Sequence, residues 1–133
     1  MWKNLVGSIA IAILGLSWTV GSANVHAQCA APPSLDGLWH ANDGGTYQVR
    51  IAGADVWWVG MSADNGRTWT NVFKGSLKGN IITGQWADVV GRNRGSGTLT
   101  LRFNGTAFME RIAATGSGFG GLRWGRGGCN DTQ

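Results

Sequence analysis

Three evenly spaced glycines, Gly53, Gly79 and Gly105, constrain the fold of this chain more than any other feature. Each lies between two short runs of β-branched and aromatic residues, and successive glycines stand 26 residues apart. Glycine adopts the positive φ that tight hairpin turns require without a steric penalty. The spacing therefore predicts a repeated unit of two strands and two turns.

Alternation of apolar and polar residues supports the same interpretation. In residues 46–51 and 98–103 every second residue is apolar, which places the apolar side chains, Leu99 and Leu101 among them, on the inner face of a strand. Three hairpins, with one strand before them and one after them, make eight strands. The sequence therefore predicts an all-β fold, an eight-stranded antiparallel up-and-down barrel whose closure removes exposed sheet edges. The predicted strands are 37–40, 46–52, 56–62, 71–77, 81–88, 98–103, 107–114 and 121–125.

Residues 1–27 have the features of a signal peptide. Lys3 precedes the apolar stretch Leu5–Leu16, and Val25–Ala27 forms a small-x-small cleavage site. The apolar stretch is shorter than the ~20 residues needed to span a bilayer. We therefore expect cleavage rather than anchoring, no stable membrane insertion afterwards, and a secreted or periplasmic single domain of residues 28–133.

Two cysteines, Cys29 and Cys129, stand near the two ends of that domain. In an oxidising compartment such a pair predicts a disulfide. Closing a loop of this length would add up to ~4.7 kcal/mol in the chain-entropy model. A metal or redox role for two thiols lacks partner ligands, because His40 is the single histidine after residue 27. We therefore predict a terminal disulfide, no metal site and no cofactor.

The first and last predicted strands resemble the calycin superfamily, which includes lipocalins and avidins. Gly37-Leu38-Trp39 matches the G-x-W that opens those barrels. Those families stack an arginine of the last strand on this tryptophan, so the resemblance implies that Arg123 covers Trp39 and closes one end of the barrel. The resemblance to avidins does not extend to biotin binding, because Ala41 and Gly45 occupy the positions of the asparagine and serine that read biotin's ureido group.

A second segment resembles the Asp-box, S-x-D-x-G-x-T-W, of sialidases and other secreted, often glycan-handling proteins. In those proteins the box is a structural turn remote from catalysis. The resemblance implies that the aspartate accepts hydrogen bonds from turn amides, that the glycine is left-handed, and that the tryptophan packs beneath the hairpin. The matching residues are Ser62, Asp64, Gly66, Thr68 and Trp69.

Charge and side-chain chemistry narrow the function. The net charge is +4, with basic residues spread along the chain rather than gathered as in a nucleic-acid footprint. Paired carboxylates spaced for glycoside hydrolysis are not evident, and a single mature histidine leaves no Ser–His or Cys–His arrangement. We therefore expect a non-catalytic protein that does not bind nucleic acid.

Three binding hypotheses remain open. Trp57 and Trp58 are adjacent on one predicted strand, so they must face opposite sides of the sheet, and the sequence does not say which faces inward. A small, largely apolar ligand in the barrel is the first hypothesis. A glycan on an exposed tryptophan is the second. The third is a structural or interaction barrel with a filled interior and no ligand, for which a homo-oligomer is one option. The predicted lining residues for the first are Tyr47, Trp57, Trp58, Asn71 and Trp86.

Overall fold

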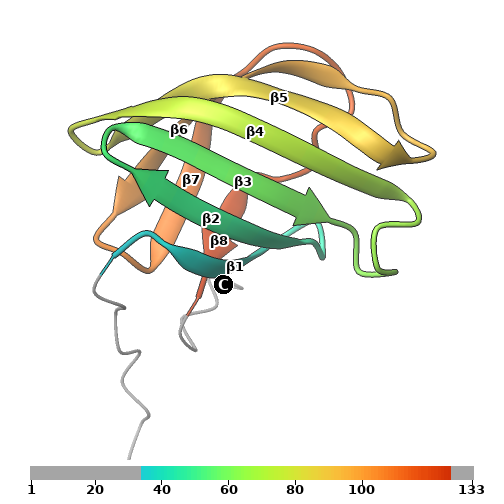
Figure 1. The fold of residues 1–133 in the computed structure, drawn as a ribbon, viewed down its shortest axis with the longest axis horizontal. Helices are drawn as coiled ribbons and strands as arrows, with labels where there is room; N and C mark the ends of the chain where they lie inside the picture. The colour runs from blue at the N-terminus through green and yellow to red at the C-terminus, as the bar shows by residue number, and fades with distance from the viewer. Residues whose placement is uncertain (1–33, 127–133) are drawn as a thin grey trace, which may run out of the picture.

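The computed structural model describes residues 34–126, which form a closed barrel of eight antiparallel strands in sequential order (Figure 1). The predicted all-β, up-and-down barrel is therefore confirmed. The signal peptide, both cysteines and their predicted disulfide lie outside the described residues. The strands are β1 (Gly37–Ala41), β2 (Thr46–Ala52), β3 (Asp55–Met61), β4 (Trp69–Lys78), β5 (Ile81–Gly91), β6 (Ser96–Asn104), β7 (Phe108–Ala114) and β8 (Arg123–Gly125).

The three evenly spaced glycines occupy equivalent turns. Gly53, Gly79 and Gly105 have φ of +64°, +61° and +61° and connect β2 to β3, β4 to β5 and β6 to β7. We call this the turn end of the barrel. The first strand begins and the last strand ends at this end of the barrel, where the Arg126 guanidinium donates a hydrogen bond to the Asp36 carbonyl. Longer connections make up the opposite, loop end, at residues 42–45, 62–68, 92–95 and 115–122.

Aromatic side chains fill the barrel interior. Trp58 stacks on Phe73 with ring centroids 4.1 Å apart, and Tyr47 meets Trp58 and Trp124 edge-on at 5.6 Å each. Such close offset and edge contacts are the arrangements that aromatic rings prefer. The large buried aromatic residues, each at most 4% exposed, are Trp39, Tyr47, Trp58, Phe73, Trp86 and Trp124.

The turn end is closed by an arginine other than the expected one. The guanidinium of Arg126, not that of Arg123, lies 4.5 Å from the ring centroid of Trp39. Arg126 Nε also donates to the Thr106 carbonyl at 2.7 Å. Arg123 is exposed because neighbouring residues of a strand face opposite sides and Trp124, next to it, points inward. The expected closure is thus present, but with Arg126 in place of Arg123.

Candidate functional site

The structure separates the predicted lining residues into two groups. Tyr47, Trp58, Asn71 and Trp86 lie inside the barrel and are buried, whereas the side chain of Trp57 lies outside and is 45% exposed. The question of which neighbouring tryptophan faces inward is thereby answered, because Trp58 belongs to the core. Four of the five residues are thus brought together in the interior, and Trp57, Trp58 and Trp86 also line a groove on the barrel wall that is described below.

Two of the inward-facing aromatic residues form hydrogen bonds within the protein, whereas the buried indole Nε1 atoms of Trp86 and Trp124 have no hydrogen-bond partner among the described residues. The indole Nε1 of Trp58 donates to Asn71 Oδ1 at 3.0 Å, and the hydroxyl of Tyr47 donates to Asp43 Oδ2 at 2.6 Å. Burial raises the pKa of Tyr47 far above its usual value, and the nearby Asp43 carboxylate raises it further. This phenol therefore stays neutral and donating over the physiological pH range.

A small cavity of about 80 Å³ lies at the loop end, between the loops and the core. Two carboxylates line it, those of Asp43 and Asp88, which accept backbone N–H bonds from Gly45 and Gly95 at 2.8 Å each. The ring of Phe119, from the β7–β8 connection, also lines it. Sequence reasoning missed these three lining residues. Asp88 could have been found from the sequence, because it stands two residues after the inward-facing Trp86 on β5 and so faces the same side. Phe119 lies in a connection without a periodic pattern.

The β3–β4 connection has the hydrogen bonds that the Asp-box resemblance implied. The Asp64 carboxylate accepts from the backbone N–H of Thr68 at 3.1 Å, from the Thr68 hydroxyl at 2.7 Å and from the Ser62 hydroxyl. These bonds hold the pKa of Asp64 well below its usual range, with the Ser62 bond contributing most. Gly66 has φ of +80°, in the left-handed region. Trp69 is half-buried, and its ring centroid lies 5.8 Å from that of Tyr47.

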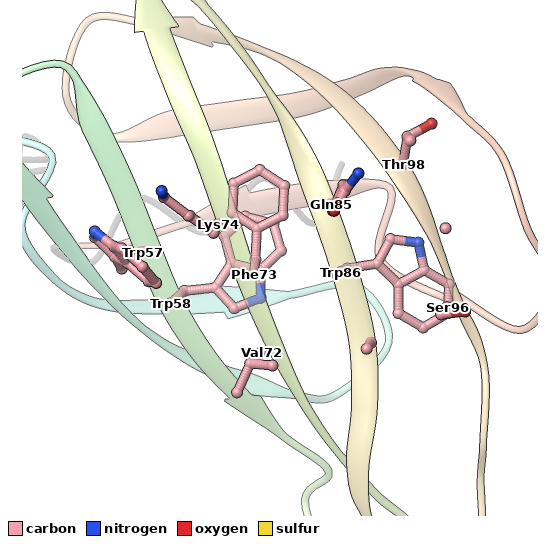
Figure 2. Close-up of a pocket in the computed structure, with 11 residues that line it drawn as sticks. Trp57, Trp58, Val72, Phe73, Lys74, Gln85, Trp86, Ser96 and Thr98 are labelled. Atoms are coloured by element: carbon pink, nitrogen blue, oxygen red, sulfur yellow. The ribbon is translucent and has the colours of Figure 1, made fainter.

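A groove of about 720 Å³ runs over the outside of the barrel, across β3, β4, β5 and β6. We call it the outer groove. Its volume lies within the ~300–1,000 Å³ usual for ligand pockets. Trp57, Lys74, Gln85 and Thr98 are successive cross-strand partners along it, as Figure 2 shows. A parallel row of outward-facing residues continues the surface toward the loop end: Val59, Val72, Ala87 and Ser96.

The lining of the outer groove combines an aromatic face with hydrogen-bonding groups. The Nζ of Lys74 lies 5.0 Å from the ring centroid of Trp57. Gln85, Ser96 and Thr98 add an amide and two hydroxyl groups along the same surface. None of the residues that line the groove carries a carboxylate. The groove can therefore stack against an apolar ring face and bond to polar substituents at its edges, with a positive local charge.

Comparison with protein-family models, with curated proteins and with solved structures finds no match for this chain. Across residues 34–126 no three His, Cys, Asp or Glu side chains lie close enough together to hold a metal ion. The same stretch contains no helix of the length and hydrophobicity needed to cross a bilayer.

Proposed function

We propose that this chain is an exported, non-catalytic binding protein that holds a saccharide in the outer groove against the indole of Trp57. The observation that carries the proposal is the exposure of Trp57. A tryptophan that remains 45% exposed within a groove of about 720 Å³ presents a large apolar face to solvent. Exposed apolar surface of this kind, rimmed by polar side chains, marks interaction sites.

Saccharide chemistry fits this lining. One face of a sugar ring carries C–H groups that pack on an indole, and its hydroxyl groups both donate and accept hydrogen bonds. Trp57 offers the stacking face, which aromatic residues supply at binding surfaces. Gln85 and Thr98, next along the same row, offer an amide and a hydroxyl group that can donate and accept. The expected export and the glycan-handling proteins that the Asp-box segment resembles point in the same direction.

An apolar ligand inside the barrel is supported less well. Tyr47, Trp58 and Trp86, three of the predicted lining residues, already pack with other aromatic rings. The loop-end cavity of about 80 Å³ equals the volume of roughly three water molecules. We keep a calycin-like ancestry as part of the proposal, on the strength of the closed eight-stranded topology and the arginine stacked on Trp39.

Isothermal titration calorimetry of the purified protein against a panel of neutral and acidic oligosaccharides tests the proposal. We expect saturable binding by at least one class and a loss of at least about tenfold in affinity, equal to about 1.4 kcal/mol, in Trp57→Ala. Val89→Ala is the matched control, because Val89 is also an exposed apolar residue and does not line the outer groove. Equal affinity in the two variants, or no binding by any member of the panel, would contradict the proposal.

A further inference from the structure

We infer that the outer groove selects carboxylated saccharides over neutral ones, an inference that rests on the proposed function and specifies its ligand class. The starting observation is the register of the sheet around Trp57. Its cross-strand partner on β2 is Arg50, and its partner on β4 is Lys74. The exposed indole therefore has a cationic side chain on each side.

Neither cation forms an ion pair with an acidic side chain of the part of the chain that the structure describes. Among residues 34–126 the ion pair formed is the one between Arg102 and Glu110. Asp55, which is also exposed on β3, lies in the next row toward the turn end, opposite Ser76, and does not line the groove. Of the described residues, Lys74 is thus the one charged residue that lines the groove, and Arg50 adds a second cation beside the indole without lining the groove.

This arrangement suits a sugar ring that bears a carboxylate. The ring stacks on Trp57, and its carboxylate accepts charge-assisted hydrogen bonds from Lys74 on one side or Arg50 on the other. Such bonds are roughly twice as strong as those between neutral groups. Because the side chains are exposed, the electrostatic part of the affinity must weaken as salt screens it. A neutral sugar gains the stacking and the hydrogen bonds to Gln85 and Thr98, and it is bound without that salt dependence.

The aliphatic row beside the groove allows a different occupant, a second copy of the chain. Val59 and Val72 are both exposed on the outer face, as is Leu38. Lysine, however, is depleted at protein–protein interfaces. Lys74 lies over the exposed ring of Trp57 on this surface. We therefore favour a saccharide, and self-association becomes a distinguishable outcome of the test.

The test uses pairs of saccharides that differ in the carboxylate. Oligogalacturonate is compared with its fully methyl-esterified form of equal length, and sialyllactose with lactose, by calorimetry at low and high salt. We expect at least one acidic member to bind about tenfold more tightly than its neutral partner at low salt, with the difference removed at about 1 M salt, where the Debye length falls to ~3 Å. Lys74→Gln should remove most of the preference.

Lys78→Gln is the matched control, since Lys78 is an exposed lysine of the same strand that does not line the groove. Equal binding of acidic and neutral partners, lost in Trp57→Ala, overturns the charge preference and leaves the proposed function standing. Binding by no saccharide overturns both. Concentration-dependent dimerisation in sedimentation velocity, abolished by Val72→Glu and accompanied by no saccharide binding, assigns the surface to a second copy and also overturns the inference.

Discussion

Trp57 and Trp58 are consecutive residues of one strand that point to opposite faces of the barrel wall, and the same side chain differs there in its burial and its contacts. Trp58 is 4% exposed, stacks on Phe73 and donates a hydrogen bond to Asn71. Trp57 is 45% exposed, and its ring contacts an ammonium group rather than another ring. Burial of the Trp58 ring therefore contributes to the stability of the fold, whereas the Trp57 ring stays accessible from solvent.

The largest expected effect follows from this contrast. Trp58→Ala should lower the free energy of unfolding by about 3–5 kcal/mol, because it leaves a cavity in a packed core. Trp57→Ala should change it by no more than about 0.5 kcal/mol, as at most surface positions. Urea denaturation of both variants measures the difference.

A milder variant protects that comparison if Trp58→Ala does not fold. Trp58→Phe keeps an aromatic ring and loses the indole N–H, so it should cost less but still more than Trp57→Phe. Equal losses of stability at the two positions would show that the inner and outer faces do not differ in the way the burial of these side chains indicates.

A smaller effect is expected from two arginines near the end of the chain. Arg126→Ala should lower the free energy of unfolding by about 2 kcal/mol, because it removes a charged hydrogen-bond donor and a cation on Trp39. Arg123→Ala, at an exposed position, should change it by less than about 0.5 kcal/mol. Thermal and urea unfolding of both variants tests this, and a larger effect at Arg123 would return the closure to the residue expected from sequence.

The smallest effect concerns an exposed loop and is seen best through pH. The pKa of Asp64 is lowered in the folded state, so the unfolded chain binds more protons in the interval below its usual value of ~3.9. The stability that Asp64 contributes is therefore present at neutral pH and is lost as the pH falls through that interval. Asp64→Asn should melt at a lower temperature than the wild type at pH 7, and the gap should narrow below about pH 4.

Asp55→Asn is the control for that experiment, since Asp55 is an exposed aspartate on the adjoining strand. It removes the same charge without touching the β3–β4 connection. A gap between wild type and Asp64→Asn that stays constant from pH 7 to pH 2 would mean that the carboxylate does not support the hairpin.

The sequence was sufficient for the architecture because the decisive information was local. Gly53, Gly79 and Gly105 each determine a turn through their own φ, and alternation assigned Leu99 and Leu101 to the interior. These properties depend on single residues and their immediate neighbours. Eight antiparallel strands joined in sequential order then admit a closed sheet as the arrangement without free edges.

The wrong assignment of Arg123 arose from relying on a family pattern rather than on parity. Trp124 is the inward-facing residue of the last strand, so the next position of the same parity is residue 126. Parity therefore favours Arg126 over Arg123 as the arginine that reaches Trp39. The information was present in the sequence, but it required a decision on which residue of β8 faces inward.

Other features of the site could not be obtained from single strands. The register of β4 and β5 shifts between Thr70 and Asn71, which leaves both Val89 and Val90 exposed despite their adjacent positions. Such a β-bulge depends on how two strands pair. The outer groove is likewise defined by neighbours on different strands. The alternation within β3 therefore predicted neither the size of the groove nor that Arg50 and Lys74 lie on either side of Trp57.

The contact between Asp36 and Arg126 also bears on how the chain can be rearranged. Because the barrel begins and finishes at the same end, a short linker could join these two points without crossing the fold. The turn at Gly79, where a side chain would meet nothing within 4 Å, then offers a place to open the chain. The strand order is therefore circular in space. A chain that starts at the Gly79 turn would keep the same barrel and the same outer groove.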